Sequence, residues 1–314
     1  MITGGRGFIG SNLVRHLATQ RLVRVLDSLE RSSPTGWEDR VDVEFVQGNI
    51  LETSDLARSV SGVNAVVHLA AYGSVVESVV DPVANFHTNV AGTFNVLNAA
   101  AMAGVRRVVF ASTGGALIGD AVPPVDEMSL PKPISPYGAS KLCGEAYCHA
   151  FAKSRGLGAV CLRFGNVYGP HSAHKKGAVT LFIKALMLDE PIVIHGDGSA
   201  SRDYIHVDDL CAGIRAGLDA DLAGGDVFHL ASGRETTVLE LAKLLCAVAG
   251  KPHHPIEFKP ARQGEVARNF ATYARAHAAL GFEPIRRLDE GLAETWEWFV
   301  RHQDIVLTAK TSDS

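Results

Sequence analysis

The glycine-rich segment from Thr3 to Gly10 constrains the fold of this chain more than any other feature. It reads Thr-Gly-Gly-Arg-Gly-Phe-Ile-Gly and continues into a helical pattern in which Leu13 and Leu17 share one face. Glycines at these positions permit a tight turn and a close approach of the backbone, so a pyrophosphate can lie on the N-terminal amides of the helix. The segment therefore predicts a dinucleotide-binding turn between a first strand and a first helix.

An acidic residue at the end of the next predicted strand indicates which dinucleotide is bound. Asp27 follows Gly10 by 17 residues. A carboxylate there can accept hydrogen bonds from the adenosine ribose and would repel a 2′-phosphate, so NAD is favoured over NADP. Only Met1 and Ile2 precede the glycine segment, although the first strand is central in such folds. Either the true start lies upstream, or the first strand is a stub that lowers stability.

Short apolar runs alternate with helix-length segments along the first half of the chain. The runs are rarely interrupted by polar residues, which indicates strands buried on both faces, and the alternation predicts an α/β fold with a doubly wound parallel sheet. We expect a nucleotide-binding domain over residues 1–165, to which residues 203–230 return with a strand at Tyr204–Val207. A smaller C-terminal α/β lobe would comprise residues 166–202 and 231–303, followed by a disordered tail at 304–314. The predicted strands and helices are Val23–Leu26, Val43–Val46, Ala65–Leu69, Val108–Ala111, Ala159–Leu162, Asn89–Met102 and Tyr137–Arg155.

Composition excludes several classes of function. The 314 residues carry a formal net charge of −4, which offers no general basic field for nucleic acid or an anionic membrane. No apolar run reaches the roughly 18 residues of a membrane span, and no signal-peptide pattern is present, so we expect a cytoplasmic protein. The five cysteines lack metal-ligand spacing, and the histidines near apparent loops lack supporting carboxylates. We therefore expect neither a disulfide nor a metal site.

A tyrosine and a lysine four residues apart begin a predicted helix and form the candidate catalytic pair. Tyr137 and Lys141 would lie on one helix face, where the ammonium can lower the pKa of the phenol and fit it for general-base work. Ser112 and Thr113 end a strand at the carboxyl edge of the sheet, where ligands bind in open α/β folds. A hydroxyl pair at this edge strengthens the interpretation of Tyr137 and Lys141 as an active-site pair.

Together with these features, several motifs resemble the extended short-chain dehydrogenase/reductases, and most closely the UDP-glucose 4-epimerase family, over nearly the whole chain. The motifs are TGGRGFIG at the start, HLAA at 68–71, NVAGT at 89–93, SPYGASK at 135–141, RFGNVYGP at 163–170 and RDYIHVDD at 202–209. The resemblance implies a Rossmann-type fold, NAD as cofactor, a UDP-sugar substrate and a homodimer paired through the helices at 89–102 and 137–155.

The same resemblance implies a role for individual residues. Tyr137 is the expected catalytic base, Lys141 its partner, and Thr113 the hydroxyl that binds the sugar, with Ser112 as the alternative. Residues expected to contact NAD are Gly4, Gly7, Phe8, Ile9, Gly10, Asp27, Asn49, Ile50, Leu69, Ala70, Ala71, Asn89, Tyr137 and Lys141. Residues expected to contact the UDP-sugar are Thr113, Asn166, Arg202, Arg262, Glu265 and Asn269.

The two residues directly after the hydroxyl pair predict the reaction. Dehydratases of this group usually carry acidic residues there, because elimination needs an additional acid and base, whereas this chain has Gly114 and Gly115. This favours 4-epimerisation over a 4,6-dehydratase or decarboxylase, and Asp27 disfavours an NADP-using reductase. Asn269 falls where epimerases differ in bulk, and its small side chain would leave room for an N-acetyl group. A non-catalytic dinucleotide sensor is the other alternative, although such proteins tend to lose Tyr137 and Lys141.

Overall fold

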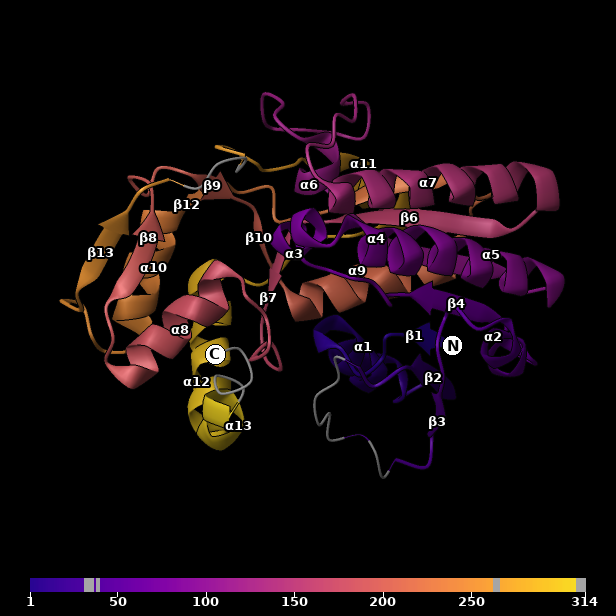
Figure 1. Cartoon of the computed structure of the whole chain (residues 1–314), viewed down its shortest axis with the longest axis horizontal. Coiled ribbons are helices and arrows are strands. Elements are labelled where there is room, and N and C mark those ends of the chain that lie inside the picture. The colour runs from indigo at the N-terminus through magenta and orange to yellow at the C-terminus, as the bar shows by residue number, and fades with distance from the viewer. Residues whose placement is uncertain (31–36, 38–39, 262–265, 309–314) are drawn as a thin grey trace.

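A parallel seven-stranded sheet forms the centre of the structure, a computed structural model that describes residues 1–30, 37, 40–261 and 266–308 (Figure 1). Within these residues the strand order is β11-β6-β5-β4-β1-β2-β3, and each neighbouring pair is parallel. This confirms the predicted doubly wound α/β fold. The strands are β1 (Ile2–Thr3), β2 (Val23–Asp27), β3 (Val43–Gln47), β4 (Ala65–His68), β5 (Arg107–Thr113), β6 (Gly158–Phe164) and β11 (Asp226–Leu230).

The first strand is short but lies at the centre of the sheet. Ile2 pairs with Val25 of β2 and with Val67 of β4, and Thr3 continues the register on both sides. Ile2 is also fully buried in the core beneath α1. Two residues are therefore enough to align β2 with β4 at the end of the sheet that carries the glycine turn.

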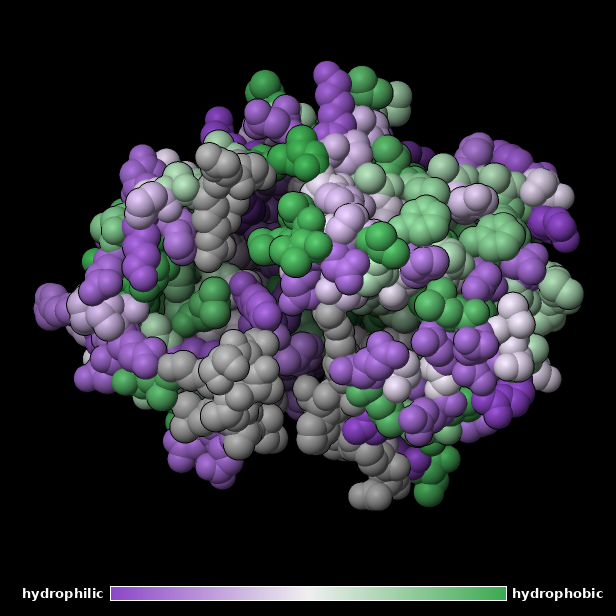
Figure 2. Space-filling model, viewed as in Figure 1, coloured by the Kyte–Doolittle hydropathy of each residue, from purple (hydrophilic) through white to green (hydrophobic). Residues whose placement is uncertain are grey.

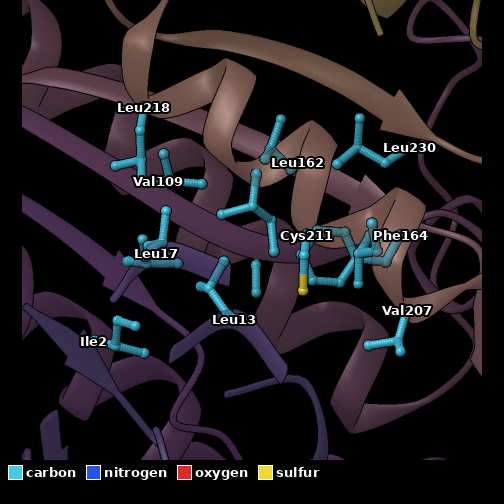
Figure 3. Packing of buried hydrophobic residues seen from close by; sticks show 14 of the residues in the cluster. Ile2, Leu13, Leu17, Val109, Leu162, Phe164, Val207, Cys211, Leu218 and Leu230 are labelled. Carbon is cyan, nitrogen blue, oxygen red and sulfur yellow. The ribbon is translucent and has the colours of Figure 1, made fainter. Parts of the chain in front are cut away.

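Helices cover both faces of the sheet. Side chains of successive strand residues point to opposite faces, so each strand contributes to a hydrophobic core on each side. Val109 packs with Leu13, Leu17 and Leu218 beneath α1 and α9 (Figure 3), whereas Val108 belongs to a second core beneath α2, α5 and α7. This explains why the strand sequences are apolar without alternation. The helical elements of this domain are α1 (Phe8–Leu17), α2 (Thr53–Val60), α3 (Val75–Val80), α4 (Pro82–Phe86), η1 (His87–Ala91), α5 (Gly92–Met102), α6 (Gly115–Ile118), α7 (Pro136–Arg155), α9 (Val207–Asp219) and α11 (Ala274–Leu280).

A third hydrophobic core lies outside the large sheet, on the left in Figure 1, and is built by helices around two short strands. Its centre contains Phe182, Ile183, Leu245 and Phe299. Two further strand pairs, β7 with β10 and β9 with β12, lie between this core and the sheet. The elements are β7 (Asn166–Tyr168), α8 (Ala178–Leu188), β8 (Ile192–His195), β9 (Ser201–Arg202), β10 (Tyr204–His206), β12 (Thr236–Thr237), α10 (Val238–Val248), β13 (Ile256–Lys259) and α12 (Leu288–Arg301).

Two predictions about the second half of the chain are wrong in part. The strand at Tyr204–His206 does not rejoin the large sheet but pairs with β7, whose backbone follows β6 directly, while α9 and β11 do return to the large sheet. The disordered tail expected from residue 304 is contradicted at its start, because Gln303–Thr308 forms helix α13, and residues 309–314 lie outside the described residues. Val306 is buried in the third core, which gives this segment a reason to order. In the described residues, no helix is long and apolar enough to cross a membrane.

Candidate active site

The predicted cofactor residues gather at the carboxyl end of the parallel sheet. The glycine turn follows β1, Asp27 ends β2, Leu69 follows β4, and Thr113 ends β5. Because these strands are neighbours and run in the same direction, the segments that follow them meet at one edge.

The glycine turn is closed so tightly that side chains are excluded from it. A Cβ atom on Gly10 would lie 2.3 Å from the Gly4 carbonyl oxygen, and one on Gly4, whose φ is +69°, would lie 2.8 Å from the Ala70 nitrogen. Helix α1 has no side-chain cap at Gly7, and its first intrahelical bond joins the Ser11 amide to the Gly7 carbonyl. A bare, glycine-lined helix N-terminus fits the pyrophosphate of a dinucleotide.

The Asp27 carboxylate is held in place at the end of β2. Its Oδ2 accepts a bond of 2.9 Å from the Arg6 amide, and its Oδ1 accepts one of 2.9 Å from the Leu29 amide. Each oxygen keeps a second lone pair for another donor, such as a ribose hydroxyl. The carboxylate therefore has the capacity to accept hydroxyl donors, and its contact with the adenosine ribose of NAD stays a prediction.

Two further residues predicted to contact NAD have side chains that interact with other parts of the protein. The Asn49 Oδ1 accepts a 3.0 Å bond from the Leu51 amide and so closes a turn after β3. Ile50 is buried in the second core, where it faces Gly92. Their contact with NAD, like that of Phe8, Ile9, Leu69 and Ala71, stays a prediction.

Helix α7 holds the candidate catalytic pair. It starts at Pro136 with the Ser135 hydroxyl accepting the Gly138 amide, so Tyr137 and Lys141 occupy its first turns. The Lys141 Nζ lies 5.8 Å from the centre of the Tyr137 ring and donates a 2.8 Å bond to the Ala111 carbonyl. Burial lowers the pKa of Lys141 to about 8 and raises that of Tyr137 to about 12.

The pKa of Tyr137 thus differs from the ordinary value in the opposite direction from the sequence prediction. The cost of burying a phenolate raises this pKa, while the Lys141 ammonium donates its hydrogen bond to the Ala111 carbonyl. General-base action near neutral pH therefore requires further positive charge close to the phenol.

The structure separates the two candidate hydroxyls. Ser112 is buried and donates a 2.6 Å bond to the Glu145 carboxylate, which also accepts two bonds from Arg163. Thr113 is the next residue of β5, so its side chain points to the opposite face, and it is only half-buried. Thr113 is accordingly the better candidate for a substrate contact, and Ser112 belongs to a buried ion-pair network that sequence reasoning missed.

Among the described substrate candidates, Asn166 and Arg202 lie on the short strands β7 and β9, and Asn269 lies near α6. Asn166 begins β7 and its side chain is exposed, while its amide donates to the Asp203 carbonyl beside Arg202. Asn269 lies against α6, because a Cβ on Gly115 would be 3.0 Å from its Oδ1. The structure therefore brings Asn269 next to the segment after Thr113. Arg262 and Glu265 lie outside the described residues.

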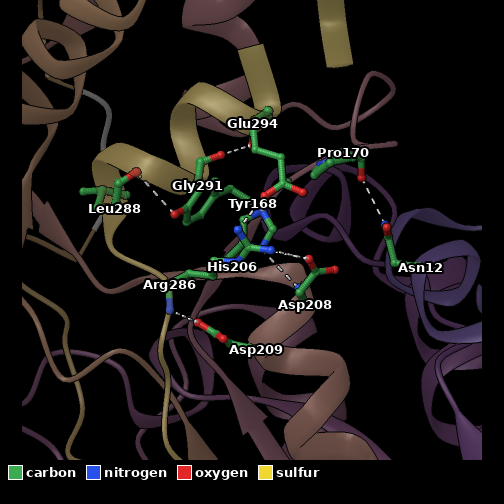
Figure 4. A network of polar contacts seen from close by, with 12 residues as sticks. Asn12, Tyr168, Pro170, His206, Asp208, Asp209, Arg286, Leu288, Gly291 and Glu294 are labelled. Carbon is green, nitrogen blue, oxygen red and sulfur yellow. Dashed lines mark hydrogen bonds and ion pairs between the residues drawn. The ribbon is translucent and has the colours of Figure 1, made fainter. Parts of the chain in front are cut away.

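One group of described side chains has the spacing of metal ligands. His206, Asp208 and Glu294 meet where α9 begins and α12 passes (Figure 4). However, the Arg286 guanidinium contacts a Glu294 oxygen at 3.0 Å and an Asp208 oxygen at 3.4 Å. Because this cation already pairs with both carboxylates, we assign no metal to the group.

Comparisons with known proteins give the family context. Residues 1–231 match the model of the NAD dependent epimerase/dehydratase family. The chain is 38% identical to a UDP-glucose 4-epimerase of Mycolicibacterium smegmatis over 95% of this chain and 97% of that protein. It is 32% identical to a dTDP-glucose 4,6-dehydratase of Streptomyces antibioticus over 95% of this chain and 91% of that protein. The crystal structure of a Thermotoga maritima UDP-glucose 4-epimerase with UDP-glucose superposes with a TM-score of 0.91, 36% identity and coverage of 96% and 98%.

Proposed function

Because the chain belongs to the NAD dependent epimerase/dehydratase family, we propose that it is a UDP-sugar 4-epimerase. The observation that carries the proposal is the set of residues at the end of β5 and the start of α7. Tyr137 and Lys141 lie in the first turns of α7, and the half-buried Thr113 ends β5. The next two residues are Gly114 and Gly115, which offer no acid or base for elimination.

In the proposed mechanism the residues of this chain bind the sugar and move one proton. Tyr137, as the phenolate, takes the proton of the sugar 4-hydroxyl and later returns it as the phenol, while Thr113 donates a hydrogen bond to the same oxygen. When bound, NAD supplies reversible acceptance of hydride from sugar C4, and its oxidised ring adds the positive charge that Tyr137 needs. Return of hydride to the opposite face of C4 gives the epimer, so no net oxidation occurs.

The hexose must be held more loosely than the nucleotide, because it has to present both faces of C4. We propose that residues 166–202 and 231–303, except α11, which packs on the large sheet, form the lobe that holds the UDP, with Asn166, Arg202, Arg262 and Glu265 as its polar contacts. Arginine suits this task because its planar guanidinium pairs with two phosphate oxygens at once. Asn269, next to Gly115, would face the sugar and leave room for a C2 N-acetyl group.

We also propose a homodimer and a cytoplasmic location. Apolar side chains gather over α4, α5 and α7 in Figure 2, and Phe94 and Tyr147 contact each other there while each is more than a third exposed. Exposed aromatic side chains on neighbouring helices are typical of a subunit interface. All five cysteines are free thiols, which suits a reducing compartment.

Proton NMR of the sugar can test the proposed activity. The purified protein would be incubated with NAD and, separately, with UDP-glucose, UDP-N-acetylglucosamine, UDP-glucuronate and dTDP-glucose, with Tyr137→Phe as control. We expect the C4 epimer of at least one UDP-sugar, no accumulation of NADH and no turnover by the variant. A 4-keto-6-deoxy product from dTDP-glucose would instead establish a dehydratase, as in the Streptomyces relative. Binding of NAD without turnover of any sugar would favour the sensor.

A further inference from the structure

A continuous chain of buried polar groups connects β1, β4 and α5 next to the glycine turn. The Ala70 amide lies 3.2 Å from the Thr3 Oγ1, which lies 2.7 Å from the His68 Nδ1. On the other side of the ring, the His68 Nε2 lies 3.0 Å from the Thr93 Oγ1, and this hydroxyl lies 2.6 Å from the Asn89 carbonyl oxygen. Thr3, His68, Thr93 and Asn89 are each at most 2% exposed.

The donors and acceptors fix the direction of every bond in this chain. A carbonyl oxygen can only accept, so the Thr93 hydroxyl must donate its single proton to Asn89. The His68 Nε2 must then carry the proton that Thr93 accepts, and in the neutral ring this leaves Nδ1 unprotonated. Thr3 consequently donates to Nδ1, and its remaining lone pair accepts the Ala70 amide. The structure therefore specifies the Nε2–H tautomer of His68.

His68 is also held in the neutral form. Burial and the nearby Lys141 ammonium lower its pKa to about 3. Its ring stacks on Phe110 at 5.9 Å, and the Lys141 Nζ lies 5.0 Å from the centre of the same Phe110 ring. A charged His68 would repel the catalytic lysine, whereas the neutral ring can stay beside it.

The far end of the chain reaches the catalytic helix. Asn89 lies in η1, a π-helical turn, and its side chain bonds the Tyr72 backbone at both ends, accepting at 2.7 Å and donating at 3.2 Å. Its Nδ2 also lies 3.1 Å from the Ser140 Oγ, which donates a 2.8 Å bond to the Tyr137 carbonyl. The backbone of Tyr137 is thereby tied to the same residue that receives the Thr93 hydroxyl.

We propose that His68 is a positioning residue that holds two segments in place, the glycine turn of the cofactor site and the helix that carries Tyr137. Through Thr3 it fixes the turn at Gly4, and through Thr93 and Asn89 it fixes the start of α7. The role toward NAD rests on the family assignment alone, whereas the role toward catalysis rests on the proposed epimerase activity.

The tautomer can be tested without any turnover. In protein labelled with [15N]histidine, the two ring nitrogens of His68, assigned by comparison with His68→Asn, should show protonation at Nε2 alone. This pattern should not change between pH 5 and pH 8. Protonation at Nδ1, or titration within this range, would overturn the proposal.

Two hydroxyl deletions test the effects of the network on catalysis and on NAD binding separately. Thr93→Val should lower kcat about tenfold, which corresponds to about 1.4 kcal/mol and is the size of one lost buried hydrogen bond. The dissociation constant of NAD should stay within about twofold. Thr3→Val should show the converse, with NAD bound about tenfold more weakly and kcat at saturating NAD nearly unchanged. The serine variants Thr93→Ser and Thr3→Ser keep the hydroxyl and should restore both values.

A matched control distinguishes positioning from general loss of stability. Thr295 on α12 is also buried and donates a 2.6 Å bond to the carbonyl four residues earlier, yet it has no histidine partner among the described residues. Thr295→Val should lower the melting temperature as much as Thr93→Val does without changing kcat or NAD affinity. Equal effects of Thr3→Val and Thr93→Val on both parameters, or a change in melting temperature alone, would refute these two separate positioning roles. If the wild-type protein turns over no UDP-sugar, the proposed function fails, while the tautomer and the NAD affinity of Thr3→Val still decide on the His68 network.

Discussion

Replacing Lys141 with methionine removes a candidate catalytic group. Relative to wild type, the variant should be more stable at neutral pH than at high pH. Burial lowers the pKa of Lys141 from 10.5 to about 8. At 1.36 kcal/mol per unit, the buried ammonium costs about 3 kcal/mol at any pH below 8. Between pH 8 and 10.5 the unfolded chain binds a proton that the folded protein has released, so this cost disappears as the pH rises. Methionine never carries the charge and never incurs the cost.

The loss of the bond to the Ala111 carbonyl acts against this gain by about 1–3 kcal/mol, at every pH. The informative quantity is therefore the change with pH of the difference in unfolding free energy between Lys141→Met and wild type. Urea unfolding followed by tryptophan fluorescence should show that this difference falls by about 3 kcal/mol from pH 7 to pH 10.5. Lys153→Met, on the exposed side of the same helix, should show no such change. A difference for Lys141→Met that is constant over this range would refute the argument.

Three further substitutions test other parts of the structure. Gly10→Ala places a Cβ against the Gly4 turn and should weaken NAD binding by tenfold or more in equilibrium dialysis, whereas Gly73→Ala, which meets open space, should not. Glu145→Gln leaves the Arg163 guanidinium buried without its counter-charge and should lower the free energy of unfolding by about 3–5 kcal/mol in urea titrations; an unchanged midpoint would contradict the buried ion pair. Phe94→Glu should convert the proposed dimer to monomer in light scattering, and a monomeric wild type would exclude this interface.

The sequence predicts the large sheet well because each strand signal is local and repeated. Five of its strands lie at nearly the places that their apolar runs indicate, and Pro136 and Gly156 mark the ends of α7 by their backbone preferences. The pairing of Tyr204–His206 with β7 could not be predicted in the same way. A strand of three residues can pair within either sheet. Its partner is decided by the position of Asn166, which follows β6 closely and starts β7.

The sequence predicts the candidate site as a set of residues but not as a set of contacts. Ser112 and Thr113 look equivalent in the sequence, yet alternation along β5 sends one hydroxyl to Glu145 and leaves the other half-exposed. The role of His68 is easily missed because its motif resembles an apolar strand end. A histidine inside an apolar strand is itself a signal, since a buried imidazole needs partners for both ring nitrogens.

The choice between epimerase and dehydratase depends on space as well as on residue type. Gly115 lies where a dehydratase would place an acid, and in this structure the amide of Asn269 occupies the space that such a side chain would enter. A Cβ at Gly115 would already lie 3.0 Å from Asn269 Oδ1, so an acidic side chain there could be accommodated only if Asn269 moved. Gly115 and Asn269 are far apart in the sequence but border the same space in the folded protein. The absence of an acid after Thr113 is therefore part of the packing of the site, which supports a reaction that needs no acid or base beyond the one that exchanges the proton of the 4-hydroxyl.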